Sequence, residues 1–336
     1  MGLVPSRRQD PPARRGDRSL PLCVHRPVGP GGSRSRPPGP MPGRSASPGL
    51  YLPVRAGAAA RFGSLPGVLD MELDFDPSEL QPHDFEKNFN DQKAREWMRN
   101  NWHMSLYFAV AYLVLIFGIQ HLMKERRAYN LRPALTLWSL SLALFSATGA
   151  IRVWKVMAFI ISTKGFKQSV CSQSFLVHPI FQFWGYLFVL SKLLELGDTV
   201  FIVLQKKKLI FLHWYHHTTT LIISWYACDD LAAGGGWSAA VNYSVHAIMY
   251  SYYAVRAAGF QVSRFIAMTI TTIQMVQIVG YIIMNVLIII WMKDNVCPTS
   301  WTVIFISSVL YVSYLVLFGN YFFQTYLRSS QKSKRE

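Results

Sequence analysis

Residues 209–228 read LIFLHWYHHTTTLIISWYAC, an apolar stretch long enough to cross a lipid bilayer that nevertheless contains three histidines. His213, His216 and His217 form an HWYHH motif within it. Because residues three and four apart share one side of a helix, all three imidazoles point into about one third of its circumference. An ionisable side chain at membrane depth costs ~3 kcal/mol, so the motif indicates a functional site inside a helical bundle.

Apolar stretches of similar length recur from Ser105 onward. We predict membrane-spanning helices at 105–123, 134–160, 181–204, 209–228, 237–257, 264–291 and 301–326. They must be helices rather than open strands, since a chain in lipid has to satisfy its own backbone hydrogen bonds. The sequence therefore predicts an all-α membrane protein whose domain at 105–326 has seven transmembrane helices.

The segments outside this domain are polar. Residues 1–70 are rich in Pro, Gly, Ser and Arg, a composition that cannot bury a core, so we predict a disordered extension. Residues 71–104 form a polar segment with a short helix predicted over 84–102. Residues 327–336 form a basic tail, and its ending KSKRE fits a dilysine-type retrieval signal to the endoplasmic reticulum.

The distribution of charge predicts an orientation in the membrane. The formal net charge is +16, but residues 1–70 hold about half of the excess and short loops hold most of the rest, which argues against a nucleic-acid partner. Loops on one side of the predicted helices, with the C-terminal tail, carry thirteen Lys and Arg, against five on the other side. Since positively charged loops stay in the cytosol, we predict a cytosolic C-terminus and a luminal N-terminus.

Two cysteines fall in loops on the predicted luminal side. Cys171 follows the second predicted helix and Cys297 precedes the seventh. The lumen is oxidising, so we predict a disulfide between them, with two unpaired cysteines as the alternative.

Three further apolar helices carry polar residues at helical spacing. These are KLLELGDT at 192–199, NYSVHAIMYSYY at 242–253 and TTIQMVQ at 271–277. Hydrogen bonds that only hold helices together would explain a single Asn or Gln. They explain poorly a set that contains Lys192, Glu195, Asp198 and His246 besides the HWYHH motif. The pattern therefore predicts a polar cavity inside the bundle.

Two chemistries could use this cavity. A di-iron centre of the membrane desaturase or hydroxylase type uses roughly eight histidines in several boxes. Of the nine histidines here, only His213, His216, His217 and His246 fall on the predicted cavity, so such a centre is short of ligands. An imidazole nucleophile or base, oriented by a carboxylate, fits the residues better. A non-enzymatic seven-helix receptor or transporter is a further alternative.

The four motifs, KLLELGDT, HWYHH, NYSVHAIMY and TTIQMVQ, resemble in order and spacing the signature of the fatty acid elongases. The resemblance runs from about residue 85 to the C-terminus. It implies a 3-oxoacyl-CoA synthase of the endoplasmic reticulum membrane, which condenses acyl-CoA with malonyl-CoA and uses no further cofactor. It also implies six helices around a closed acyl-chain tunnel, and separate reductases and a dehydratase that complete the elongation cycle.

The resemblance also implies roles for individual residues. His216 would be the acylated nucleophile and His246 would act on malonyl-CoA. The remaining predicted catalytic residues, which orient or polarise these two, are His213, His217, Asp198, Glu195 and Asn242. Those predicted to bind substrate inside the cavity are Lys192, Tyr250, Gln274 and Gln277.

Two features concern the substrate. Topology and charge predict that CoA phosphates bind Lys206, Lys207, Arg256 and Arg264, although a lysine run can also serve only as a cytosolic anchor. The Trp214-Tyr215 pair inside HWYHH resembles the branch acting on saturated and monounsaturated chains, the type three and type six elongases.

Overall fold

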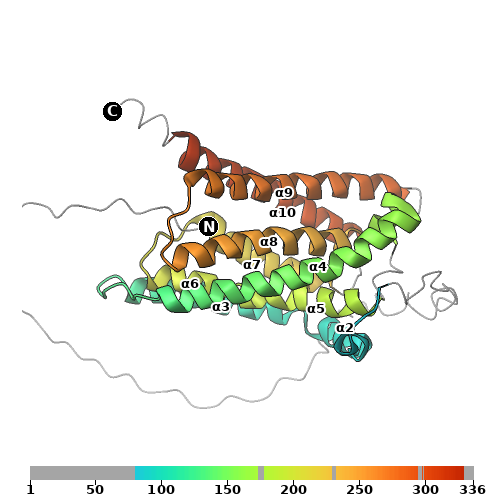
Figure 1. Cartoon of the computed structure of the whole chain (residues 1–336), viewed down its shortest axis with the longest axis horizontal. Helices are drawn as coiled ribbons and strands as arrows, with labels where there is room; N and C mark the ends of the chain where they lie inside the picture. Colours follow the sequence, from blue (N-terminus) through green and yellow to red (C-terminus); the bar gives the residue numbers. More distant parts are fainter. Residues whose placement is uncertain (1–79, 173–177, 229–231, 294–296, 298, 329–336) are drawn as a thin grey trace, which may run out of the picture. The chain divides into compact units, whose positions relative to one another are not determined.

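The structure is a computed structural model that describes residues 80–172, 178–228, 232–293, 297 and 299–328 (Figure 1). Within these ranges the regular structure is entirely helical, as predicted. The predicted extension at 1–70 and the KSKRE ending lie outside the described residues.

The polar segment before the first apolar stretch forms two short helices rather than one. They are α1 (Asp84–Lys87) and α2 (Asp91–Asn101). The break falls at an Asn-Phe-Asn sequence, and the Asn90 side chain accepts a hydrogen bond from the backbone N–H of Lys93 at 2.9 Å. Asn competes for backbone groups in this way, so it starts the second helix instead of continuing the first.

Eight further α-helices follow among the described residues, in the predicted order. They are α3 (Met104–Leu122), α4 (Arg132–Cys171), α5 (Pro179–Leu194), α6 (Gly197–Leu204), α7 (Phe211–Ala227), α8 (Gly235–Ala257), α9 (Arg264–Lys293) and α10 (Trp301–Phe322). A π-helical turn, Phe323–Arg328, continues α10. The helix boundaries agree with the sequence to within a few residues, except in two places.

The prediction that the second span ends at residue 160 is wrong, because α4 continues to Cys171. The helix kinks at Gly165, whose φ of 81° lies in the left-handed region that glycine tolerates. Beyond the kink, Val170 and Cys171 are buried against Ile288. This packing holds in helical form a segment whose lysines suggested a loop.

The predicted continuous span at 181–204 is also wrong, because the helix breaks at Glu195 and Leu196. The α6 segment starts at Gly197, where an added Cβ would lie 2.8 Å from the Trp138 ring. Such a contact is too short for a side chain, so the close approach of Trp138 requires glycine here.

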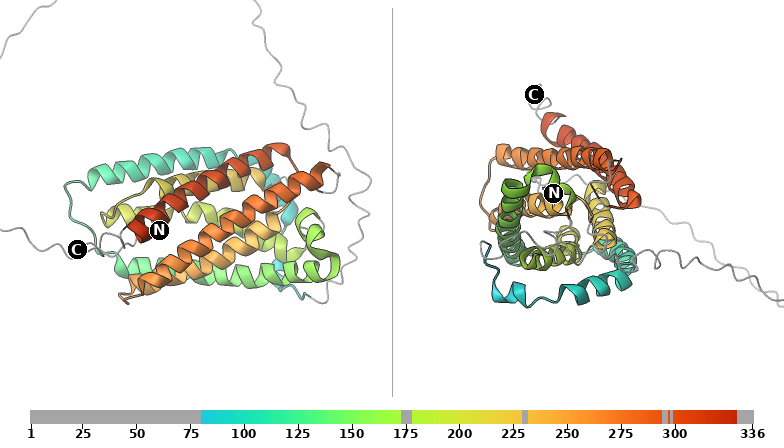
Figure 2. Two further views of the ribbon diagram at one scale, coloured as in Figure 1. Left: turned by 90° about the horizontal axis from the view of Figure 1, so that it is seen from above. Right: turned by 90° about the vertical axis from the view of Figure 1, so that its right-hand side faces the viewer.

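The helices pack as a closed ring. Neighbouring pairs are α4 with α8, α8 with α9, α9 with α10, α10 with α7, α7 with α5, and α5 with α4. The α3 helix lies outside this ring against α6 and α7. The end-on view in Figure 2 shows this arrangement around a common axis.

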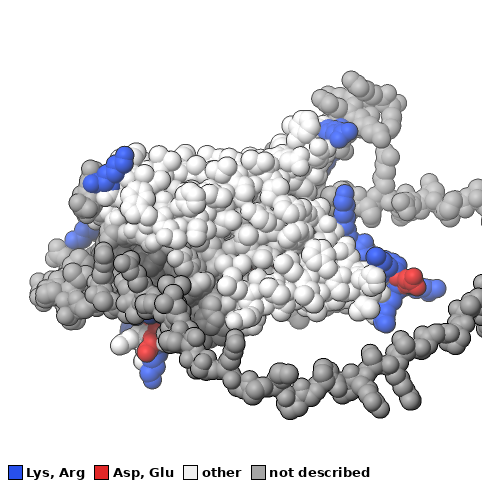
Figure 3. All heavy atoms as spheres, turned by 180° about the vertical axis from the view of Figure 1, so that it is seen from behind, with Lys and Arg blue, Asp and Glu red and all other residues white. Residues whose placement is uncertain are grey.

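Four of the helical segments are long and apolar enough to cross a membrane. They are Met104–Leu122, Arg132–Cys171, Arg264–Lys293 and Trp301–Arg328. Lys and Arg gather at the two ends of the helical part in Figure 3, and a broad uncharged surface lies between them. Large apolar side chains such as Val114, Leu144 and Phe305 are exposed on the outside. These are the features of a multi-pass membrane protein.

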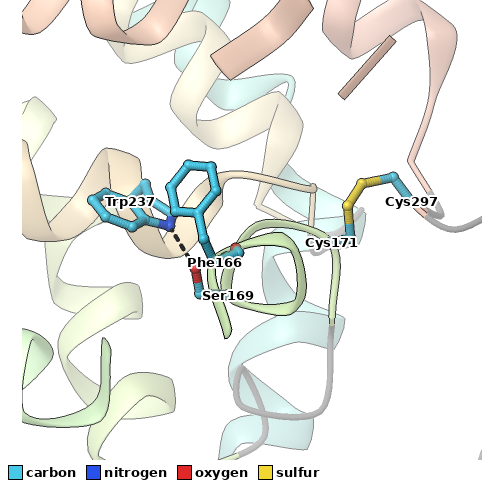
Figure 4. The surroundings of a disulfide bond; sticks show 5 residues. All are labelled: Phe166, Ser169, Cys171, Trp237 and Cys297. Atoms are coloured by element: carbon cyan, nitrogen blue, oxygen red, sulfur yellow. Dashed lines mark hydrogen bonds between the residues drawn. A yellow bond between two sulfur atoms is a disulfide. The ribbon is translucent and has the colours of Figure 1, made fainter. Parts of the chain in front are cut away.

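A disulfide joins Cys171, at the end of α4, to Cys297, before α10 (Figure 4). This is the pair predicted from loop position. Beside it, Trp237 of α8 donates from its indole N–H to the Ser169 hydroxyl at 3.1 Å. The disulfide therefore fixes the kinked end of α4 next to the start of α10, and the Trp237 hydrogen bond holds it next to α8.

A buried ion pair that the sequence did not predict connects α1 to the bundle. Arg152 of α4 donates from Nε and from a terminal nitrogen to the carboxylate of Glu86, at 2.9 and 2.5 Å, and Trp184 of α5 donates at 2.7 Å. Burial would raise the pKa of Glu86. The hydrogen bonds from Arg152, the His83 backbone and Trp184 outweigh burial, so the pKa lies below its ordinary value.

We expect Glu86→Gln to lower the free energy of unfolding by ~3–5 kcal/mol, because it leaves the buried Arg152 charge unpaired. Thermal unfolding of detergent-purified protein measures the loss, and Glu96→Gln on the exposed face of α2 is the matched control. Since the folded-state pKa of Glu86 is lowered, the wild-type protein should lose this contribution as pH falls through the acid range. Equal unfolding temperatures for the two variants would contradict the assignment.

Candidate active site

Two adjoining cavities lie inside the ring of helices. The larger, of about 270 Å³, runs between α5, α7, α8, α9 and α10, and we call it the apolar cavity. The smaller, of about 60 Å³, is called the polar chamber. His216, Asn242, Gln277 and Ile278 line both spaces, so they lie where the two meet.

The polar chamber brings together all of the residues predicted to be catalytic. Its lining includes Glu195, Asp198, His213, His216, His217, Asn242 and His246, and also the predicted substrate-binding residues Tyr250, Gln274 and Gln277. Lys192 lies on the apolar cavity, next to the chamber. Residues from α5, α6, α7, α8 and α9 thus converge on one small space, although they are distant in sequence.

Glu195 is the electrostatic centre of the chamber. Its Oε1 accepts from the ammonium of Lys192 at 2.7 Å and from the Ser191 hydroxyl at 3.1 Å, and it lies 3.6 Å from Nδ1 of His246. Lys192 also donates to the amide oxygen of Asn242 at 2.9 Å. The carboxylate therefore fixes an ammonium on one side and an imidazole of α8 on the other.

The hydrogen bonds of Asp198 go to an indole and a phenol. Trp138 of α4 donates to one carboxylate oxygen at 2.7 Å, and Tyr250 of α8 donates to the other at 2.6 Å. The Tyr250 ring lies 5.5 Å from that of His246. Asp198 thus positions Tyr250 beside His246. Trp138 was not predicted, because one indole in an apolar helix carries no distinguishing signal.

The three imidazoles of α7 have different surroundings. His213 lies at the back of the group, with its Nε2 2.9 Å from the Thr199 hydroxyl, and that hydroxyl is 2.7 Å from the phenol of Tyr112 in α3. The His217 ring is 4.4 Å from that of His213. Of these three imidazoles, His216 alone lines both cavities. Thr199 and Tyr112 are supporting residues that the sequence analysis did not assign.

The apolar cavity extends away from His216 along α5 and α7. Aromatic and aliphatic side chains, with scattered hydroxyls and amides, form most of its wall. Its lining continues from His216 to Cys228, twelve residues later on α7, a rise of ~18 Å. The shape and lining suit a long unbranched hydrocarbon.

The four basic residues predicted to bind CoA line neither cavity. Lys206 donates to the backbone carbonyls of Lys124 and Arg126 at 2.9 and 3.1 Å. Arg264 donates to the carbonyls of Thr325 and Tyr326 at 2.8 and 3.0 Å. Both therefore stabilise ends of the helical bundle in this structure.

The surroundings of Lys207 and Arg256 differ from those of Lys206 and Arg264. The pKa of Lys207 is lowered by burial first, and then by the positive charges of Arg132 and Arg256. The charges of Arg132 and Arg256 therefore act on Lys207 in the loop between α6 and α7, and the three cations together would favour an anion.

Two of the chamber imidazoles have ring nitrogens that face neighbouring side chains. Among the described residues, no three His, Cys, Asp or Glu side chains are grouped as ligands for one metal ion. Nε2 of His213 faces Thr199, and Nδ1 of His246 faces the carboxylate that also holds Lys192.

We expect Lys192→Met to lower the free energy of unfolding by ~3–5 kcal/mol, because Glu195 would keep a buried charge without its ammonium partner. The double variant Lys192→Met with Glu195→Leu should recover most of that loss, since neither charge remains. Thermal unfolding with Lys93→Met, an exposed lysine of α2, as control tests this. A double variant less stable than the single one would contradict it.

Comparison with known proteins agrees with the arrangement. The ELO: GNS1/SUR4 family matches residues 97–334. The very long chain fatty acid elongase 6 of Homo sapiens is 52% identical over 256 residues, which cover 76% of this chain and 97% of that protein. The Gallus gallus elongase 6 is equally similar, with the same coverage of both chains.

The very long chain fatty acid elongase 3 of Homo sapiens is 40% identical over 268 residues, covering 80% of this chain and 98% of that protein. The resemblance read from the four motifs is thereby confirmed, and this chain belongs to the ELO: GNS1/SUR4 family.

Proposed function

We propose that this chain is a 3-oxoacyl-CoA synthase that lengthens a long-chain acyl-CoA by two carbons from malonyl-CoA, with release of CO2 and CoA. The observation that carries the proposal is the position of His216 on both cavities. A nucleophile there can hold an acyl chain in the apolar cavity while its carbonyl carbon faces the polar chamber. The names of the similar elongases support the same activity.

The first step transfers the acyl group to the enzyme. A nitrogen of neutral His216 attacks the thioester carbonyl, the C–N bond forms, the C–S bond breaks, and CoA leaves as a thiolate that takes up a proton. His217, whose ring lies 5.6 Å from that of His216, and His213 behind it form the wall that positions the nucleophile. Thr199 fixes the His213 ring through its hydroxyl.

The second step forms the carbon–carbon bond. Malonyl-CoA loses CO2, and the electron pair of the broken bond becomes an enolate of the remaining thioester. The enolate carbon attacks the acyl-imidazole and a C–C bond forms. The C–N bond to His216 breaks, its electron pair returns to the imidazole, which takes up a proton, and 3-oxoacyl-CoA is released. His246, beside Glu195, and the Asn242 amide, held by Lys192, lie where they can stabilise the negative charge.

The substrate class follows from lining and charge. The Trp214-Tyr215 pair, which lines neither cavity, resembles the branch acting on saturated and monounsaturated chains. Gln274 and Gln277 line the chamber where the thioester would lie. The combined positive charge of Lys207, Arg132 and Arg256, which act on one another electrostatically, would favour the phosphates of CoA. The reaction needs no cofactor beyond the two substrates.

The membrane arrangement is part of the proposal. Seven spans result if α5 and α6 count as one broken helix and α7 and α8 also cross the bilayer. With 17 residues, α7 is short for a span, and histidines take the place of apolar residues in it. The loop charges favour a luminal N-terminus and a cytosolic C-terminus in the endoplasmic reticulum. Reductases and a dehydratase would be the functional partners.

Mass spectrometry of purified protein incubated with palmitoyl-CoA alone tests the nucleophile. We expect an acyl adduct on His216 that His216→Ala abolishes. His121→Ala, an exposed histidine at the end of α3, is the control and should keep the adduct. An undiminished adduct in His216→Ala would refute this role for His216.

Metal analysis tests the type of chemistry. We expect the purified active protein to contain no stoichiometric iron and to condense palmitoyl-CoA with malonyl-CoA in the presence of a chelator. Stoichiometric iron whose removal abolishes activity would contradict the proposal and favour an oxidase.

A further inference from the structure

Charged side chains line the apolar cavity only at its two ends, within the part of the chain that the structure describes. Lys192 lies at the end near His216. Asp91 and Arg95 lie at the other, and they come from α2, a helix outside the ring. Charged groups at the far end of the apolar cavity require an explanation, because contact with the methyl end of an acyl chain would be unfavourable for them.

The far end is an organised polar group. Asp91 and Arg95, one helical turn apart on α2, form an ion pair, and the Gln182 side-chain amide of α5 donates to Asp91 at 3.0 Å. The side chains of Asp91 and Arg95 are 14% and 29% exposed, so one side of the pair remains hydrated. Its other side faces the cavity, whose lining also includes Tyr186 and Cys228.

The depth of this group below the chamber can be read from two helices. Gln182 precedes Lys192 by ten residues on α5, a rise of ~15 Å. Cys228 follows His216 by twelve residues on the antiparallel α7, a rise of ~18 Å. The two rises are similar, so Gln182, which binds Asp91, lies about 15 Å along α5 from Lys192, and the lining on α7 reaches a comparable depth from His216.

We propose that the Asp91–Arg95 pair with Gln182 is the specificity-determining stop that sets the longest acyl chain the cavity accepts. The proposal rests on the proposed function. A chain end that reached the pair would have to displace its remaining water without replacing the lost hydrogen bonds. A shorter chain ends among apolar side chains and meets no such penalty. The pair therefore limits chain length in two ways: it occupies the space that a longer chain would need, and removing its water costs free energy.

The arrangement of α1 and α2 supports a fixed stop. The Glu86 ion pair with Arg152 and the Trp184 indole hold α1 against α4 and α5. Asp91 follows four residues after the end of α1, and Gln182 ties it to α5. Phe89 packs on Phe183 and Tyr186 of the same helix, with ring centroids 5.6 and 5.5 Å apart. The α2 helix is thus held by contacts at several points.

The test replaces both charges together, Asp91→Leu with Arg95→Leu, so that no unpaired buried charge remains. Condensation with malonyl-CoA is measured for saturated acyl-CoAs of even length from dodecanoyl to docosanoyl. We expect the ratio of kcat/KM for the longest accepted chains to that for the shortest to rise about 10-fold or more, since burying or excluding methylenes changes specificity on this scale. In the wild-type protein, kcat/KM should fall steeply once the acyl chain exceeds one particular length.

The matched control is Lys93→Leu with Glu96→Leu, which removes one charge of each sign from the exposed face of the same helix. Neither residue lines the cavity, and this variant should keep the wild-type chain-length profile. An unchanged profile in the Asp91/Arg95 variant, or the same shift in the control, would overturn the proposal.

A binding measurement separates this proposal from the proposed function. Cys228 lines the far end of the cavity, and its alkylation by N-ethylmaleimide in a Cys23→Ser background reports chain occupancy without malonyl-CoA. Longer acyl-CoAs should protect Cys228 more strongly in the Asp91/Arg95 variant than in wild type. If no protein condensed any acyl-CoA, the proposed function would fail, and the protection pattern would still decide whether the pair limits chain length. Equal protection in both proteins would refute the stop.

Discussion

The site depends on one constraint, which is that the Glu195 carboxylate is buried deep within a bundle whose outer surface consists of apolar side chains. A lone carboxylate at this depth would protonate or draw in water. Lys192 and the Ser191 hydroxyl satisfy it from its own helix, and His246 approaches it from α8. The helix breaks at the same residue, so Glu195 and Asp198 face one chamber. Placing these polar groups inside the ring requires helices that are less apolar than ordinary spans.

This requirement explains which helices are recognisable as membrane spans. The segments that pass by length and apolarity are α3, α4, α9 and α10 with its π-helical turn. Most of the chamber residues come instead from α5 through α8, which are shorter, broken or more polar. These helices were nevertheless predicted as apolar stretches of about spanning length, and their polar motifs marked the chamber.

The chamber was predictable because its residues occur in motifs at helical spacing. All seven residues assigned as catalytic line one space of about 60 Å³. Contacts across long sequence distances were not predictable. The bond from Trp138 to Asp198 joins residues 60 apart, and that from Arg152 to Glu86 joins residues 66 apart. No local pattern distinguishes such a Trp or Arg from its neighbours. The helix break at Glu195 was missed for the same reason, since Gly197 is required by an indole on another helix.

The two short helices α1 and α2 impose an order on assembly of the protein. They precede the first apolar helix in the chain, yet Gln182 and Trp184, which bind Asp91 and Glu86, follow them by 91 and 98 residues. During synthesis α1 and α2 emerge first and cannot dock until α5 is in place. Contacts at such separation carry a high loop-closure entropy and form late. The floor of the apolar cavity is therefore completed after the helices that form its walls, and a partly assembled bundle would leave that cavity open at one end.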